Sequence, residues 1–351
     1  MSKGLRVSLL LCLILLLLAG CSSRVPLSFP QANTPPRVDT IEQPVTVIPL
    51  KGPLSRRKAQ LSGLVWYGDN LILLPQYPNR FENNLFYLTK EEIISLLRGD
   101  THEPLRPRPI PLVMDELLTR IPGFQGFEAI AFDGERAFLT VEAKADDQMI
   151  GYLVAGDLES DLSELRLTPD LISSIAPQTN LNNVSDEAIL LEGDQIVTIY
   201  EVNGSLANLS PIAHVFSTDG LQLVSTIPFP LIDYRITDTT NLDEADRFWA
   251  INSFTLPGYP LRLGMEALAV KYGVGPTHQV SHVVERLVQF QYSSTGITLV
   301  DIPPVQLQLL DDTARNWEGI VRLESVEFSG FLLVTDRQPA TILAFVPYAF
   351  E

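Results

Sequence analysis

Alternating apolar and polar positions divide most of this chain into hairpins of one kind. In five places a small polar or acidic residue begins a run of apolar, β-favouring residues, which turns at polar residues and returns to a second polar position. The hairpins span residues 62–76, 128–142, 187–201, 238–252 and 318–336. The first four are of equal length, and the fifth has four extra residues in its turn. A hairpin that recurs in this way predicts the blades of a β-propeller.

The strands outside these hairpins set the number of blades. They are predicted at residues 85–88, 152–155, 213–217, 221–227, 287–292 and 297–302, with short helical insertions at 91–97, 115–120 and 169–175. After the last hairpin only residues 341–346 remain, one strand too few for a four-stranded blade, whereas residues 44–50 form a strand with no partner nearby. We therefore predict an all-β, five-bladed β-propeller of four-stranded blades closed by an N-terminal strand. The alternative has six blades, with residues 285–301 as a degenerate blade.

The N-terminus has the features of an export signal. Lys3 and Arg6 precede an apolar run at residues 7–18, which is too short to cross a bilayer as a mature helix. The tetrapeptide Leu18-Ala19-Gly20-Cys21 resembles the lipobox of bacterial lipoproteins. This resemblance implies cleavage before Cys21 and a lipid on its sulfur; the alternative is an uncleaved membrane anchor.

This signal divides the chain into three parts. We predict a lipoprotein signal peptide at residues 1–20, lipidated Cys21 with a flexible, proline-rich tether at residues 21–42, and the propeller at residues 43–351. The domain is then extracytoplasmic and anchored to a bacterial membrane by its lipid.

The cysteine count and the net charge exclude some kinds of site and some kinds of partner. Cys12 leaves with the signal peptide and Cys21 is acylated, which excludes disulfides, thiolate metal sites and cysteine nucleophiles from the mature domain. The chain has 25 basic and 42 acidic residues, a net charge of −17. Such a surface repels nucleic acid, so the expected partners are the membrane, through Cys21, and a small-molecule or protein ligand.

The polar ends of the hairpins are predicted to meet at the axis. The first residue of one strand and the last residue of the next lie at the same end of an antiparallel hairpin. The residues that open the hairpins therefore form one ring, which consists of Ser62, Glu128, Glu187, Asp238 and Glu318. The residues that close the hairpins lie beside it: Gln76, Glu142, Glu201, Asn252 and Asp336.

Four carboxylates in one ring need a compensating charge. Two of them about 5 Å apart repel by on the order of 3 kcal/mol at an effective dielectric constant of about 20. Either a cation lies among them, or some are protonated with a raised pKa. The donors are hard oxygens without His or Cys, which favours Ca²⁺ over zinc, copper or octahedral magnesium. We predict a calcium site; the alternative is a latch, in which these side chains hydrogen-bond to neighbouring strands.

The ring positions carry a family resemblance. Their contexts are Leu-Ser62-Gly-Leu, Phe-Glu128-Ala-Ile, Asp-Glu187-Ala-Ile, Thr-Asp238-Thr and Trp-Glu318-Gly-Ile. This order resembles the five-bladed calcium-dependent apyrases, and the Glu-Gly/Ala-Ile motif is similar to bacterial propellers classed as "esterase-like activity of phytase". The resemblance implies that the five ring residues are calcium ligands. Apyrases carry paired arginines after the inner hairpin of their third blade, but residues 200–204 contain none here.

Two functions from different classes follow, and whether the protein is an enzyme stays open. The favoured one is a non-catalytic propeller that binds a ligand or partner around its calcium ion. The other is a calcium-dependent hydrolase of phosphoesters or esters. In that case Glu142, Glu201 or Asp336 is the general base. The cations Arg337, Lys144, Arg235 and Arg315 then clamp an anion or else form salt bridges with the carboxylates around them.

Overall fold

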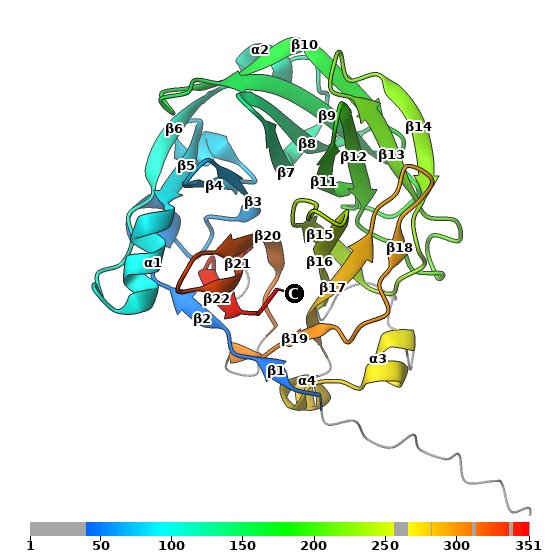
Figure 1. Cartoon of the computed structure of the whole chain (residues 1–351). Coiled ribbons are helices and arrows are strands. Elements are labelled where there is room, and N and C mark those ends of the chain that lie inside the picture. The colour runs from blue at the N-terminus through cyan, green and yellow to red at the C-terminus, as the bar shows by residue number, and fades with distance from the viewer. Residues whose placement is uncertain (1–39, 256–265, 282, 311–313, 337–339, 351) are drawn as a thin grey trace, which may run out of the picture. The chain divides into compact units, whose positions relative to one another are not determined.

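The five predicted hairpins are the inner halves of five blades. The computed structural model describes residues 40–255, 266–281, 283–310, 314–336 and 340–350. Within them, the innermost strand of each blade contacts the innermost strand of the next, so that the five blades surround one axis (Figure 1). The inner hairpins, from the first blade to the fifth, are β3 (Leu61–Tyr67) and β4 (Asn70–Pro75), β7 (Phe124–Asp133) and β8 (Arg136–Ala145), β11 (Asp186–Glu192) and β12 (Gln195–Tyr200), β15 (Arg235–Thr239) and β16 (Arg247–Phe254), and β20 (Trp317–Glu324) and β21 (Ser329–Thr335).

Outer strands complete the first three blades. They are β5 (Asn84–Thr89) and β6 (Arg108–Val113) in the first blade, β9 (Gln148–Leu158) and β10 (Leu165–Ile175) in the second, and β13 (Ile212–Ser217) and β14 (Leu223–Pro228) in the third. The outermost strands β6 and β10 also pair in parallel, with Leu112 opposite Leu165, so the first two blades form one continuous sheet.

The start of the chain closes the ring, as predicted. The fourth blade contains β17 (Val284–Gln291), β18 (Thr298–Leu299) and β19 (Val305–Leu307), and β1 (Glu42–Gln43) pairs with β19 in parallel. The fifth blade contains β22 (Leu343–Pro347) and, as its fourth strand, β2 (Thr46–Ile48), with Val47 opposite Ala344. The spare N-terminal strand therefore supplies the strand that the fifth blade lacks, and the prediction of five blades is confirmed.

Helices are few and lie between strands. They are α1 (Lys90–Arg98), α2 (Asp115–Leu118), α3 (Ala267–Tyr272) and α4 (Pro276–Ser281), with 3₁₀ turns η1 (Pro53–Ser55) and η2 (Pro78–Phe81). The helix predicted at residues 169–175 is wrong, because this segment belongs to β10. Pro169 falls where the register between β10 and β9 shifts, between Leu167 and Ile172, and an irregular ladder accommodates a proline. None of the helices in the described part of the chain is long and apolar enough to cross a membrane.

Gly319, the residue after the ring position of the fifth blade, has a packing role. A Cβ atom on Gly319 would lie 2.6 Å from Val334 Cγ2 and 3.0 Å from the backbone carbon of Gly63. The inner strands β20 and β3 therefore approach each other too closely for a side chain at Gly319. The Glu-Gly motif, from which a family was inferred, thus has a structural reason at this position.

Because of this packing, we expect the effect of a valine on the free energy of unfolding to differ strongly between Gly319 and Thr239. We expect Gly319→Val to lower the free energy of unfolding by roughly 1–3 kcal/mol, because it overpacks the contact between β20 and β3. Thr239 holds the matching place after the ring residue of the fourth blade, and its buried hydroxyl has no hydrogen-bond partner in the described residues. Thr239→Val is therefore the control, and urea unfolding of both variants is the measurement. Equal stability of the two would contradict this reading.

Candidate functional site

A break in strand pairing places each ring residue. In four blades the register shifts by one residue at this point, between Leu61 and Gly63, Phe127 and Ala129, Asp186 and Ala188, and Trp317 and Gly319. Ser62, Glu128, Glu187 and Glu318 are the residues skipped. In β15 the shift is wider, between Ile236 and Thr239, and it contains Asp238. Because a β-bulge re-aims its side chain, these breaks turn the ring residues out of the regular sheet pattern.

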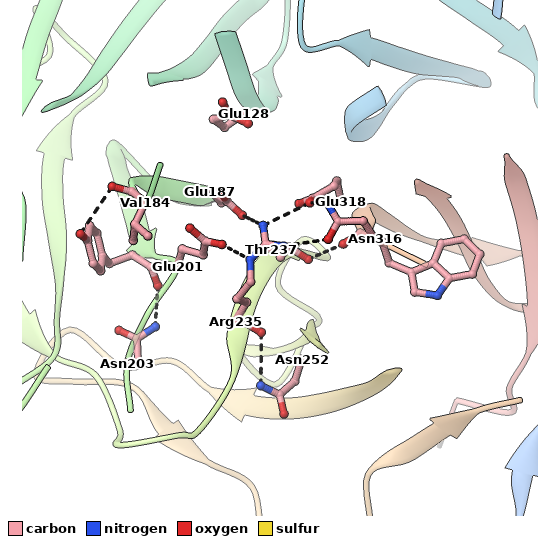
Figure 2. Close-up of polar contacts among 12 residues, drawn as sticks. Glu128, Val184, Glu187, Glu201, Asn203, Arg235, Thr237, Asn252, Asn316 and Glu318 are labelled. Atoms are coloured by element: carbon pink, nitrogen blue, oxygen red, sulfur yellow. Dashed lines mark hydrogen bonds and ion pairs between the residues drawn. The ribbon is translucent and has the colours of Figure 1, made fainter. Parts of the chain in front are cut away.

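The guanidinium of Arg235 lies at the centre of the acidic residues. Its Nη2 donates to Glu187 Oε2 at 3.3 Å and to Glu318 Oε1 at 3.1 Å (Figure 2). Its Nε donates to Glu201, and its Nη1 donates to Asn316 Oδ1 at 2.7 Å. Every nitrogen of this side chain thus has an acceptor, and carboxylates from the third and fifth blades share one cation.

Glu128 lies in the same buried cluster with an amide as its hydrogen-bond partner. Gln76 Nε2 lies 3.2 Å from Glu128 Oε1 and 3.4 Å from Oε2. Burial, followed by the neighbouring charges of Glu142 and Glu187, raises the pKa of Glu128 well above its usual value. Burial also raises the pKa of Glu142 to about 7, although Arg235 acts in the opposite direction. Burial therefore favours the protonated form of Glu128.

The carboxylates that contact Arg235 are balanced between opposing influences. Burial raises the pKa of Glu187 and of Glu318 to about 8, with other carboxylates adding to the increase, while the positive charge of Arg235 lowers both values. Groups this close titrate together, so the cluster holds a shared set of protons near neutral pH.

Ser62 and Asp238 act as the latch that was the alternative to metal ligation. Ser62 Oγ donates to the carbonyl oxygen of Phe127 at 2.7 Å, which joins the inner strands of the first and second blades. Asp238 Oδ2 accepts from the backbone N–H of Ile320 at 2.8 Å and joins the fourth blade to the fifth. Thr237, beside it, donates to the carbonyl of Trp317 at 2.6 Å.

The residues that close the hairpins also fall into two groups, those in the axial cluster and those that bond elsewhere. Glu142 and Glu201 lie in the axial cluster, and the charge of Asp336 raises the pKa of both Glu187 and Glu318. Asn252 instead accepts from Arg286 Nε at 2.8 Å and donates to backbone carbonyls. Arg337 and Cys21 lie outside the described residues.

Among the predicted cations, Arg235 forms ion pairs with three of the axial carboxylates. Arg315 pairs with Glu285 at 3.4 Å, and Lys144 Nζ donates to Asn182 Oδ1 at 3.2 Å near the surface. Arg235 and Arg315 thus both form salt bridges with carboxylates, which was predicted as the alternative to clamping an anion. Sequence reasoning missed that Arg235 is the centre of the site; its only signal was its position three residues before a ring residue.

Calcium stays a prediction. It was inferred because the clustered carboxylates need a compensating positive charge, and Arg235 supplies one such charge. One oxygen each of Glu187, Glu201 and Glu318 accepts a hydrogen bond from Arg235, which supplies a positive charge within the cluster. Within the described residues, no group of three or more His, Cys, Asp or Glu is arranged to hold a metal ion. No step proposed below depends on a calcium ion. A rise in melting temperature with added calcium would show binding elsewhere on the folded chain.

The raised pKa values predict that stability depends on pH. Glu142, Glu187 and Glu318 have values of about 7, 8 and 8, above the 4.5 of an unperturbed glutamate. Their protonation favours the folded state, so this contribution is fully present below about pH 4.5 and is lost as the pH rises through 7 to 8. We expect the melting temperature to fall between pH 5 and pH 8, and to fall less steeply in Glu187→Gln. A melting temperature that rises over this range would contradict the assignment.

The comparisons with known proteins point to other propellers than those predicted. No protein-family model matches the chain, and no curated protein sequence matches it. Similar solved structures include a mutant α-L-arabinanase from Cellvibrio cellulosa, which is 10% identical, with 84% of this chain and 93% of that chain covered and a TM-score of 0.46. A GH43 endo-arabinanase from Bacillus licheniformis is 9% identical, covering 86% and 97%, with a TM-score of 0.43. The GH62 α-L-arabinofuranosidase catalytic domain from Coprinopsis cinerea is 7% identical, covering 88% and 97%, with a TM-score of 0.47.

These findings correct the predicted family and function. The three similar solved structures named above are arabinanases and an arabinofuranosidase rather than apyrases or phytase-like propellers, so that resemblance was wrong. Non-catalytic binding around a central calcium ion and phosphoester or ester hydrolysis were both inferred with it, and both are withdrawn. The hydrogen bonds of Arg235 agree with this correction, because all three of its nitrogens donate to protein acceptors rather than facing a phosphate.

Proposed function

We propose that this propeller is a glycoside hydrolase whose acid–base chemistry takes place at the axial carboxylates. One observation supports it above the others. The carboxyl groups of one site have different partners: Glu128 is buried beside the amide of Gln76, whereas Glu187 and Glu318 share Arg235, whose positive charge favours their ionised form. Glycosidic cleavage by a pair of carboxyl groups needs such different environments, which push the pKa values of the two groups apart.

The roles follow from the partner of each group. Glu128 is the general acid, which donates its proton to the glycosidic oxygen as the bond to the leaving sugar breaks. Glu187 or Glu318, whose ionised form Arg235 favours, stabilises the positive charge that develops on the sugar ring, as a nucleophile or as the base that activates water. Arg235 is a positioning residue, since it holds both carboxylates through a single nitrogen.

The proposed setting is the outer surface of a bacterial membrane, where a lipid on Cys21 holds the domain. A net charge of −17 is compatible with a neutral polysaccharide as the substrate. Lipidation is tested by mass spectrometry of the mature chain and its Cys21→Ser variant.

The test of function is a screen with aryl glycosides, including α-L-arabinofuranosides and β-galactosides, which are suggested by the names of the similar structures. We expect the wild-type chain to cleave at least one of them and the double variant Glu187→Gln/Glu318→Gln to cleave none. Glu116→Gln, which changes an exposed glutamate of α2, is the control for the effect of an amide substitution. Absence of cleavage by the wild type, or undiminished cleavage by the double variant, would reject the proposal.

A further inference from the structure

A cavity lies at the opposite end of the propeller from Arg235. Its volume is about 860 Å³, and it is bordered by the turn between β15 and β16, the end of β20 and the segment after β22. Glu324, on its rim, pairs with Ser329 beside the turn of the fifth blade, whereas the ring residues lie where the inner strands begin. The two ends of a hairpin lie on opposite faces of a propeller, so this cavity is separate from the axial carboxylates.

Hydrogen-bond donors and acceptors lie side by side in the wall of this cavity. Asp243 Oδ2 lies 3.1 Å from Arg247 Nε and 3.6 Å from Arg322 Nη2. Arg322 is incompletely satisfied: its Nε is buried and has no hydrogen-bond partner within the described residues. Glu244 and Glu324, both exposed, form no ion pair in the same part of the chain and add acceptors at the rim.

Aromatic rings form the apolar side of the cavity. Tyr348 and Phe350 are half-buried, with ring centroids 5.3 Å apart, and Tyr348 packs on Trp249 at 5.1 Å. The guanidinium of Arg322 lies over the ring of Phe350, 5.3 Å from its centroid. Partly exposed rings beside directed polar groups provide both an apolar contact surface and fixed hydrogen-bonding positions.

We propose that this cavity is a second binding site and that it takes a neutral saccharide. Sugar hydroxyls donate and accept, so they match arginine donors and carboxylate acceptors in one wall. An anionic ligand would meet Glu244 and Glu324 at the rim, and a cationic ligand would meet Arg247 and Arg322 within. The sugar faces pack on Tyr348 and Phe350.

This inference goes beyond the proposed function and does not depend on it. A polysaccharide held at this face would keep the chain on its polymer whether or not the axial carboxylates cleave it. Binding without cleavage would leave the saccharide site standing and remove the hydrolase; cleavage without binding would do the reverse.

The test measures retention of the detergent-solubilised full chain on beads that carry arabinan, galactan or xylan. The chain also carries Glu128→Gln, so that bound polymer is not cut. Ala245 lines the cavity from the β15–β16 turn, and Ala245→Trp fills it. The matched control is Glu135→Trp, in the corresponding exposed turn of the second blade. We expect retention on at least one polymer, a loss of tenfold or more in apparent affinity with Ala245→Trp, and no loss with Glu135→Trp.

A second variant protects the result against misfolding. Glu324→Ala removes an exposed rim acceptor without filling space, and we expect it to weaken retention severalfold at an unchanged melting temperature. No retention on any neutral polymer, equal retention by Ala245→Trp, or retention on polygalacturonate beads alone would overturn the proposal.

Discussion

Glu128→Gln is expected to lower kcat for glycoside cleavage by a factor of about 10²–10⁴, the usual contribution of a general acid. The amide keeps the size of the side chain and its neighbour Gln76 but has no proton to give to the leaving group. We expect the loss to be large with an alkyl or sugar leaving group and small with 2,4-dinitrophenol, which leaves without protonation. Steady-state kinetics on the two substrates measures the difference.

The dependence on the leaving group separates catalysis from structure. A residue that only supports the fold would lower both rates equally and would lower the melting temperature. Glu128→Gln should instead melt at or above the wild-type temperature at pH 8, because it removes a buried carboxyl group whose charged form is disfavoured by burial. Equal losses on the two substrates would take the role of general acid away from Glu128.

Arg235→Met is expected to destabilise the protein by roughly 3–5 kcal/mol at pH 8, the range for removing one partner of a buried ion pair. The side chain volume is kept, but Glu187, Glu201 and Glu318 lose the cation they share. The buried carboxylates then repel each other without compensation. Chemical denaturation at pH 8 measures the loss.

The pH dependence of this variant identifies the cause. At pH 5 Glu187 and Glu318, whose pKa values are about 8, are protonated at little cost, so we expect the difference between Arg235→Met and wild type to shrink by half or more. Arg286→Met is the control, because it removes a buried arginine from a two-residue pair with Glu266, whose pKa is lowered by that arginine. A destabilisation by Arg235→Met that is the same at pH 5 and pH 8 would show that lost packing, rather than charge, is responsible.

Much of the fold was predictable because its signals are local. Each inner hairpin carries its own alternation of apolar and polar residues and its own turn, and all five lie where they were predicted. The place of the N-terminal strand followed from a count of strands, because the fifth blade was one strand short and the strand predicted at residues 44–50 had no partner. The segment at 169–175 was mistaken for a helix because a bulge opposite β9 keeps Pro169 in a strand, and such pairing is invisible in one segment alone.

The site was predicted in part. The acidic residues that gather at the axis were named from their places in the hairpins, but their compensating charge was assigned to calcium. Arg235 reaches them from the first position of β15, and its acceptors come from residues up to 83 positions away in the sequence. No local pattern marks an arginine as the partner of carboxylates that remote.

Sequence periodicity was thus sufficient to place five polar positions at the beginning of five inner strands, because turn residues and alternation act over a few neighbours. Only the folded chain decided which of them face the axis. Ser62 and Asp238 have short side chains that reach no further than the backbone of the adjacent blade, whereas the longer glutamates Glu187 and Glu318 extend to Arg235. That division depends on the spacing between blades, which is a property of the closed ring and not of any single hairpin.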